Sequence, residues 1–206
     1  MKISSNKLMV YKIAFIGTHG VGKTILALNV ERKLRIKEVE ATTIKEIARE
    51  ASRIGFPINL HTTLEAQTYI LHQQMAQELD HSTIRPGAPH AQVVISDRSV
   101  FDNYCYLERA LKGKEQGNAL NMVLGHGRDF PYDKLYLLPI TNGEITNDGT
   151  RATEREFQEE MDRRVRTFLT EHRIPYTELP VPKEEDEHRK IWTEIIIRET
   201  LEGLRR

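Results

Sequence analysis

One segment near the start of the chain combines residue types and spacing that are typical of a phosphate-binding loop. It matches the pattern G-x-x-x-x-G-K-[ST] at every specified position, with the residues Gly17, Thr18, His19, Gly20, Val21, Gly22, Lys23 and Thr24. Glycines accept the backbone angles that point successive N–H groups toward phosphate oxygens. Lys23 would add a positive charge at the β- and γ-phosphates, and the Thr24 hydroxyl would coordinate Mg²⁺. The segment therefore predicts a site for ATP and magnesium, in which His19 and Val21 occupy variable positions.

A carboxylate follows a second segment, which reads as a buried strand. Residues 91–96 are short, rich in β-branched residues and uncharged, and Asp97 comes directly after them. This position places Asp97 at the same sheet edge as the phosphate loop, where magnesium or its bound water must be held. The alternative is that Asp97 caps a helix that begins near Ser99. Arg98 is a candidate catalytic and substrate-binding residue that would reach a phosphate from this edge, or else pair with a surface carboxylate.

Several polar residues are candidates for binding the molecule that receives a phosphoryl group. Glu46 follows the second predicted strand, and its carboxylate could accept the proton of an attacking hydroxyl. Gln67 and Gln74 border the apolar face of a long predicted helix and could bind a polar edge of the substrate. Exposed, solvated side chains are the alternative for all three. Asp102, one helical turn after Arg98, is a further candidate substrate-binding residue.

Two arginines lie at the start of a late helix. Arg151 and Arg155 place positive charge at the positive end of the helix dipole, which is unfavourable unless a phosphate lies nearby. Neutralisation by neighbouring glutamates is the alternative. The preceding glycine-containing loop is long enough to close over a site and exclude water. We therefore expect a lid over about residues 140–155, with Arg151 as a catalytic residue and Arg155 as a nucleotide-binding residue.

Strands and helices alternate along the whole chain. Short apolar runs predict strands over 10–16, 38–42, 91–96, 134–138 and 174–179. Helical periodicity predicts helices over 23–34, 44–54, 62–80, 99–112, 118–125, 153–170 and 186–204. Two helices begin with the spacing of a capping box, formed by Thr62 with Glu65 and by Thr153 with Glu156. Strict alternation predicts an α/β fold in three layers, with a parallel sheet covered by helices on both faces and ligands beyond the carboxyl ends of its strands.

The composition limits the classes of protein to consider. The 206 residues suit a single domain over 1–206, and 30 basic residues balance 30 acidic ones, so nucleic acid is not an expected partner. The sequence has no signal-peptide core and no apolar run of about 18 residues, so we expect a cytoplasmic protein without a membrane span. Cys105 is the single cysteine and is expected to serve in packing. Formation of a homodimer is possible and is not indicated or excluded by the sequence.

These segments, in this order, resemble the P-loop nucleoside and nucleotide kinases, and especially the ribosylnicotinamide-kinase-like branch with a small AAA-type ATP-binding domain. The matching pieces are IAFIGTHGVGKT, KEIAREASRIGFPIN, VVISDRSVFDNYCY and NDGTR. The resemblance implies transfer of the ATP γ-phosphoryl group to a small acceptor such as a nucleoside, a nucleotide or a related riboside. It implies that Asp97 and Arg98 serve magnesium and phosphate, and that Arg151 and Arg155 close over the transferred group. It also implies about five parallel strands, with the phosphate-loop strand at the centre.

Two other functions are consistent with a phosphate loop. A regulatory ATPase would hydrolyse ATP slowly and act through a protein partner, whereas a guanine-specific switch would need an N-K-x-D segment, which the sequence lacks. A kinase acting on nucleic-acid ends is disfavoured by the neutral net charge. An assay of acceptor-dependent ADP formation would separate these possibilities.

Overall fold

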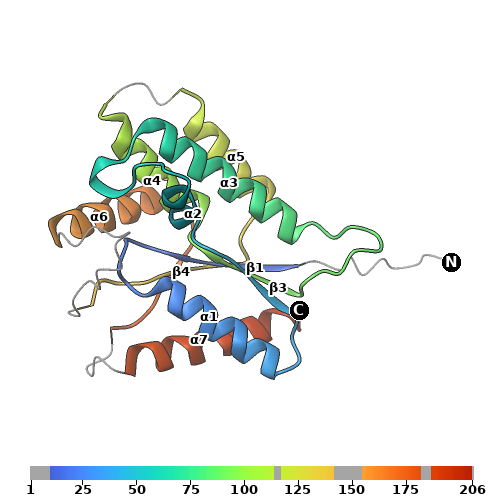
Figure 1. Cartoon of the computed structure of the whole chain (residues 1–206). Coiled ribbons are helices and arrows are strands. Elements are labelled where there is room, and N and C mark those ends of the chain that lie inside the picture. The colour runs from blue at the N-terminus through green and yellow to red at the C-terminus, as the bar shows by residue number, and fades with distance from the viewer. Residues whose placement is uncertain (1–9, 114–116, 142–154, 182–186, 206) are drawn as a thin grey trace.

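The chain folds around one parallel sheet whose central strand leads into the phosphate loop. The computed structural model describes residues 10–113, 117–141, 155–181 and 187–205. The sheet has five strands, in the order β2 (Ala41–Ile44), β3 (Val93–Asp97), β1 (Tyr11–Ile16), β4 (Lys134–Leu137) and β5 (Thr177–Glu178) (Figure 1). All four strand pairings are parallel. The predicted five-stranded parallel sheet, with the phosphate-loop strand at its centre, is confirmed.

Strand register brings the two predicted phosphate-site segments to the same edge. Phe15 of β1 lies opposite Asp97 of β3, and Ile16 of β1 lies opposite Leu137 of β4. The loop that follows Ile16 and the carboxylate of Asp97 therefore leave neighbouring strands at the same level. This arrangement follows from parallel pairing, because the carboxyl ends of all strands meet at one edge.

Two helices cover one face of the sheet. They are α1 (Lys23–Ile36) and α7 (His188–Gly203), which lie side by side below the sheet in Figure 1. Ile13 and Phe15 of β1 point to this side and join Leu26 of α1 and Trp192 of α7 in one buried cluster. The alternate residues of β1 point to the opposite face, as expected for a strand that is buried on both sides.

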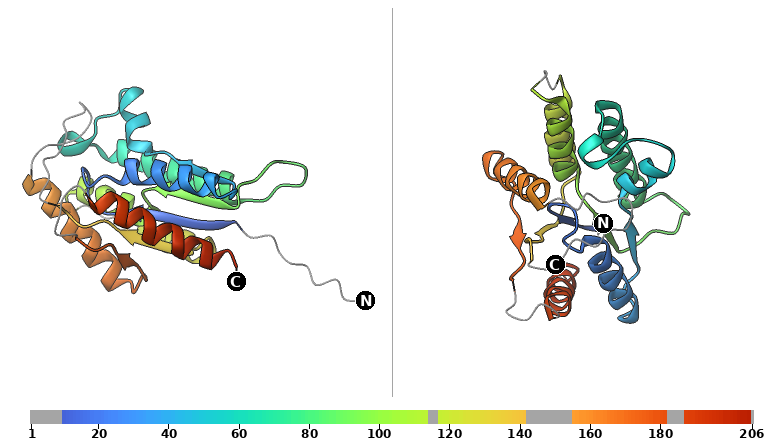
Figure 2. Two further views of the ribbon diagram at one scale, coloured as in Figure 1. Left: turned by 90° about the horizontal axis from the view of Figure 1, so that it is seen from below. Right: turned by 60° about the vertical axis from the view of Figure 1, so that its left-hand side comes forward.

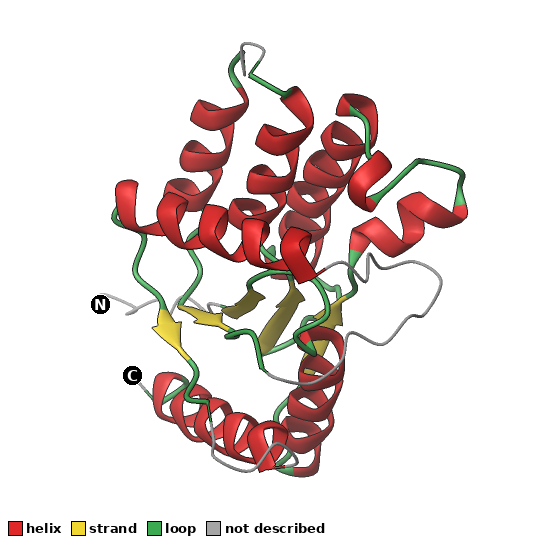
Figure 3. Ribbon diagram, turned by 90° about the vertical axis from the view of Figure 1, so that its left-hand side faces the viewer, coloured by secondary structure: helices red, strands yellow, loops and turns green. Residues whose placement is uncertain are grey.

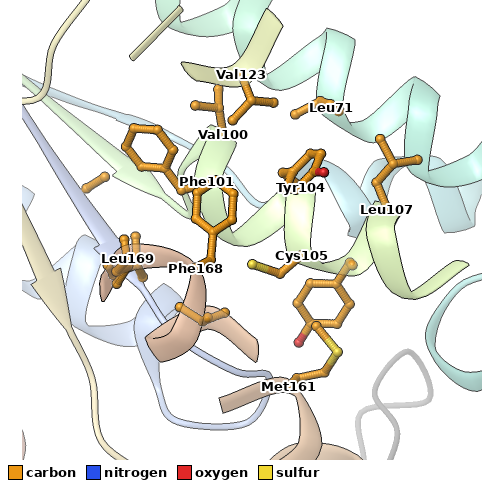
Figure 4. Packing of buried hydrophobic residues seen from close by; sticks show 14 of the residues in the cluster. Leu71, Val100, Phe101, Tyr104, Cys105, Leu107, Val123, Met161, Phe168 and Leu169 are labelled. Atoms are coloured by element: carbon orange, nitrogen blue, oxygen red, sulfur yellow. The ribbon is translucent and has the colours of Figure 1, made fainter. Parts of the chain in front are cut away.

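The opposite face is covered by a thicker helical layer. It contains α2 (Ile47–Arg53), a short 3₁₀ helix (Asn59–His61), α3 (Leu64–Ser82), α4 (Val100–Leu111), α5 (Ala119–Asp129) and α6 (Arg155–Glu171). Figures 2 and 3 show the sheet between this layer and the α1–α7 pair, which gives the three layers expected from the sequence. Cys105 is buried in the main cluster of this side, between Tyr104 and Met161 in the close view of Figure 4. Its predicted packing role is confirmed.

Two local details differ from the sequence predictions, the cap of α3 and the start of β2. The cap of α3 is Thr63, whose hydroxyl accepts a hydrogen bond from the Ala66 N–H at 3.3 Å, so the predicted Thr62–Glu65 capping box is wrong. The reason is that the Thr62 N–H closes the preceding 3₁₀ turn, which delays the helix by one residue. Strand β2 begins at Ala41 because α1 runs on to Ile36 and a turn follows it. Thr153 lies outside the described residues.

The described helices do not include one with both the length and the apolar character that crossing a membrane requires.

Candidate active site

The phosphate loop has the backbone shape that its glycines predict. Gly17, Gly20 and Gly22 all have positive φ, at 130°, 76° and 90°. A Cβ atom on Gly17 would also stand 3.0 Å from the Leu138 carbonyl oxygen, so a larger residue would both strain the turn and press on the backbone just after β4. Gly22 leads directly into α1, whose first turn contains no acidic residue and no side-chain cap. The free N–H groups of that turn are therefore open to an anion.

Lys23 is buried inside the loop that it would help to charge. Its ammonium group donates hydrogen bonds to the carbonyl oxygens of Gly17, at 3.1 Å, and Thr18. Burial, and then the positive charge of Arg98, lower the pKa of Lys23 to about 7 against the opposing effect of nearby carboxylates. A phosphate group at this place would stabilise the charged ammonium form.

Asp97 and Thr24 meet directly beside the loop. The Thr24 hydroxyl donates to Asp97 Oδ2 at 2.6 Å, whereas buried Oδ1 has no hydrogen-bond partner among the described residues. Burial and the negative charge of Glu46 raise the pKa of Asp97 to about 6. The helix cap at this point is Ser99, which forms a capping box with Asp102. Asp97 is therefore not the N-cap of α4. Its carboxylate lies beside the Thr24 hydroxyl, the other group predicted to bind magnesium.

The Arg98 side chain is held by two carboxylates, and its backbone is strained. Its Nε donates to Glu46 Oε1 at 3.0 Å, and its Nη1 donates to Asp102 Oδ2 at 3.3 Å. The guanidinium also lies 4.9 Å from the centre of the Tyr106 ring. These partners are buried or half-buried, so Arg98 is not a solvated surface residue. Its φ of 110° is unusual for a residue with a side chain and costs about 1–3 kcal/mol, a kind of strain that often marks functional sites.

A cavity lies between the phosphate loop, α2, α3 and α4. Three of the predicted substrate-binding residues line it, namely Glu46, Gln67 and Arg98. The remaining lining residues are His19, Ala48, Arg49, Ile58, Asn59, Ile70, Asn103 and Tyr106. The cavity thus joins a loop residue to the Glu46–Arg98 pair, with amide groups and apolar side chains around them.

The two glutamines predicted to contact substrate lie in different surroundings. Gln67 lines the cavity, and its amide donates to the Thr62 hydroxyl at 2.7 Å. Gln74 is fully buried outside the cavity lining, and its amide is engaged by Glu78, Ser96 and the Arg98 carbonyl. Neither glutamine is solvated.

Asp102, another predicted substrate contact, is engaged by neighbouring groups. Its carboxylate accepts hydrogen bonds from Ser99 N–H at 2.6 Å and from Ser99 Oγ at 2.8 Å as well as from Arg98. It completes the capping box of α4 with Ser99, holds Arg98 and does not line the cavity, and its role in substrate binding stays a prediction.

His19 joins the phosphate loop to two helices of the thick layer, which its variable position in the motif did not indicate. Its backbone N–H donates to the Tyr106 hydroxyl at 3.2 Å, and its carbonyl accepts from Gln158 Nε2 at 2.9 Å. The His19 ring packs against that of Phe157 in a tilted arrangement, with centroids 4.8 Å apart. Val21, the other variable residue, is buried in the cluster with α1 and α7. Tyr106, Phe157 and Gln158 give no distinct signal in the sequence, because their helical spacing also fits ordinary core packing.

Of the two arginines of the expected lid, only Arg155 lies within the described residues. Arg151 lies outside the described residues, as does most of the predicted 140–155 lid. Arg155 is the first residue of α6, and its exposed guanidinium donates to Glu159 Oε1 at 3.0 Å and to the Thr141 carbonyl oxygen at 3.3 Å. The role of Arg155 in nucleotide binding stays a prediction.

Comparison with solved structures gives the same fold at low sequence identity. A NadR protein crystallised with NAD and AMP-PNP superposes with a TM-score of 0.69 at 15% identity, over 93% of this chain and 50% of that one. A NadR protein with NR gives 0.65 at 17% identity, over 92% and 52%. Deoxyadenosine kinase from M. mycoides, with dCMP and dCDP bound, gives 0.61 at 17% identity, over 91% and 97%. The chain thus spans about half of the NadR chains and nearly all of the deoxyadenosine kinase.

Comparison with curated proteins gave no match. A family model described as an AAA domain matches residues 12–189, which include the phosphate loop, Asp97 and the whole cavity. Because that match covers most of the sequence, this chain belongs to the AAA domain family that the model describes.

Proposed function

We propose that this chain is an ATP- and magnesium-dependent kinase that transfers the γ-phosphoryl group to a hydroxyl of a small, nucleoside-like acceptor. The observation that carries the proposal is the cavity in which His19 of the phosphate loop and the Glu46–Arg98 pair line the same space. A phosphoryl donor and a hydroxyl acceptor must meet in line at such a junction. A binding module for ATP alone would have no need of a second polar cavity there.

The phosphate loop supplies the donor half of the reaction. The N–H groups of the loop and of the first turn of α1 would bind the β- and γ-phosphate oxygens. Lys23 would exchange its hydrogen bonds to the Gly17 and Thr18 carbonyls for bonds to these oxygens. Charge on the transferred group is stabilised by donors that are already in place and shielded from water, which is the main source of rate in phosphoryl transfer.

The chemistry of Thr24 and Asp97 fits magnesium. Both offer hard oxygen ligands, and the buried Oδ1 of Asp97, which has no partner within the part of the chain that the structure describes, is an acceptor that a cation or its bound water would satisfy. When bound with ATP, magnesium neutralises charge on the β- and γ-phosphates. Thr24 and Asp97 are the residues that would hold it.

The cavity supplies the acceptor half. Glu46 would accept a hydrogen bond from the attacking hydroxyl and take its proton, and Arg98 would donate to the transferred group. Asp97 does not line the cavity, so Glu46 is the better placed of the two carboxylates for this role. Gln67 and Asn103 offer amide groups, and Ile58 and Ile70 offer apolar surface.

A small ring with hydrogen-bonding edges suits the combined amide and apolar lining. The ligands in the structural neighbours, NR in one NadR structure and deoxynucleotides in deoxyadenosine kinase, support an acceptor of this class. Arg151, and with it Arg155 at the start of α6, is proposed to close over the phosphates when both substrates are bound.

The test is an ADP-formation assay with panels of nucleosides, nucleoside monophosphates and vitamin-like ribosides. At least one panel member should raise ADP formation well above the rate with ATP alone, and Lys23→Ala should abolish the rise. Slow ADP formation that no small acceptor stimulates would contradict a kinase. If a co-purifying protein changed that slow rate, the regulatory ATPase would replace it. Oligonucleotides with free 5′ ends, added to the same assay, would report a nucleic-acid end kinase.

A further inference from the structure

Gln74 stands behind the cavity, between α3, β3 and α4. Its Nε2 donates to Ser96 Oγ at 2.7 Å and to Glu78 Oε1 at 2.9 Å, and it also lies 3.4 Å from the Arg98 carbonyl oxygen. Its Oε1 accepts from Asn103 Nδ2 at 3.4 Å. The two short contacts fix the plane of the carboxamide, and the two longer ones place it against residues that line the cavity. No part of the proposed reaction uses Gln74 directly.

The side chain is itself held from behind by a buried ionic network. Glu78, one turn further along α3, is fully buried and pairs with Lys12 Nζ at 3.0 Å. Glu78 also lies 3.1 Å from His126 Nε2, and it accepts from the Tyr132 hydroxyl. These groups come from β1, from α5 and from the segment before β4. Gln74 therefore cannot turn toward another partner without leaving a buried carboxylate less satisfied.

Arg98 needs such a support, because its backbone is in a conformation that a residue with a side chain rarely adopts. Its φ is 110°, and its guanidinium is aimed into the cavity by Glu46 and Asp102. Those two carboxylates hold the end of the side chain. Gln74 and Ser96 lie on the backbone side, where the strained peptide leaves β3.

We propose that Gln74 is a positioning residue, whose carboxamide keeps the strained Arg98 backbone in place so that the guanidinium faces the acceptor and the transferred phosphoryl group. The inference rests on the proposed function, because it assigns to Arg98 a contact with the reacting groups. It replaces the prediction, made from helical spacing alone, that Gln74 touches the substrate. In this arrangement the buried Lys12–Glu78 pair supports the site indirectly, because Glu78 holds Gln74.

The kinetic test compares Gln74→Met with Gln73→Met. Gln73 is the neighbouring glutamine on α3, half-buried and outside this network, so it controls for the change of residue type. Gln74→Met should lower kcat/KM for the acceptor by about tenfold and leave Mg·ATP affinity unchanged, and Gln73→Met should change neither. In an Arg98→Lys background the same Gln74→Met change should cost less than about threefold. An equal fall in both backgrounds would mean a general weakening of the fold and would overturn the proposal.

A crystal structure of Gln74→Met gives a readout that does not depend on turnover. The expected result is an Arg98 peptide that has relaxed out of the positive-φ region, with its ion pair to Glu46 lengthened or lost. An Arg98 unchanged in backbone and side chain would refute the positioning role even if the protein proved not to be a kinase. If Gln74→Met does not fold, Ser96→Ala removes the shortest contact of Gln74, and the same shift of Arg98, smaller in extent, is expected. Absence of acceptor-dependent ADP formation by the wild type would instead refute the proposed function.

Discussion

Burial of Lys23 links nucleotide binding to proton uptake. In the ligand-free site burial and Arg98 bring the pKa of this ammonium to about 7, whereas bound phosphates would raise it. At pH 8 the free protein therefore carries mostly neutral Lys23, and binding must add a proton. Because the free protein must take up this proton, affinity for Mg·ATP should fall by up to about tenfold per pH unit above pH 7. Well below pH 7 Lys23 is already protonated and should give no such dependence.

Calorimetry of Mg·ATP binding at pH 8, in two buffers with different heats of ionisation, measures this uptake. The observed heat should differ between the buffers in the direction of proton uptake, and Lys23→Ala should remove the difference. Asp97, with its pKa raised to about 6 by burial and Glu46, is ionised at pH 8 and does not interfere. A buffer-independent heat in the wild type would show that Lys23 already carries its proton in the free protein.

Removing the charge of Glu46 and removing that of Asp97 should change different kinetic parameters. Glu46 lines the cavity and Asp97 bonds to Thr24, so they belong to the acceptor and the metal side respectively. Glu46→Gln should lower acceptor-dependent kcat by about 10²–10⁴-fold with little change in Mg·ATP affinity. Asp97→Asn should raise the magnesium concentration needed for half-maximal rate.

Glu50→Gln is the matched control, because Glu50 is an exposed glutamate on α2, the short helix whose N-cap is Glu46. Initial rates at varied acceptor and varied magnesium separate the two effects. If both variants changed the same parameter by the same factor, the division of roles between the two carboxylates would be wrong.

At the scale of elements, helix α5 shows how closely the thick layer is packed. Two of its glycines, Gly125 and Gly127, lie one on either side of His126. A Cβ on Gly127 would stand 2.4 Å from Phe101 Cζ, whereas the nearest atom to a Cβ on Gly125 is a flexible arginine nitrogen at 4.0 Å. Phe101 is buried, and its ring packs against the rings of Tyr132 and Phe168, so it cannot move away from the new methyl group without disturbing these contacts.

Gly127→Ala should therefore destabilise the protein by about 1–3 kcal/mol, because it overpacks the core around Phe101. Gly125→Ala should be neutral or stabilise by up to about 1 kcal/mol, because alanine favours the helical state. Urea unfolding of both variants measures the difference. Equal effects of the two substitutions would contradict the tight approach of α5 to α4.

The order of the elements was readable from the sequence, but the partners of individual side chains were not. Short apolar runs and the glycine loop identify β1, α1 and β3, because each signal is contained within one stretch of chain. The cap of α3 was misplaced by one residue, because the 3₁₀ turn ending at Thr62 has no clear pattern of its own. Periodicity placed Gln74 at the border of an apolar face. Only the packing of α3 against β3 and α4 shows that it turns inward to Ser96.

At the scale of the whole molecule, the site is formed by the sheet together with the thicker of the two helical layers. Parallel pairing of β1 with β3 brings the phosphate loop to Asp97, and the thick layer adds Glu46, Arg98 and Tyr106 around the cavity. The donor half could be predicted because it is one contiguous motif. Asn59, Asn103 and Tyr106 could not, because the cavity exists only where α2, α3 and α4 meet, and no local pattern encodes that junction.

The most direct test of this account follows the phosphoryl group itself. The protein is incubated with magnesium, γ-labelled ATP and the acceptor that best stimulates ADP formation, and the products are separated. The label is expected on the acceptor in an amount equal to the ADP formed, and Glu46→Gln and Lys23→Ala should both suppress its appearance. Label found only as inorganic phosphate, in amounts that no acceptor alters, would contradict the account.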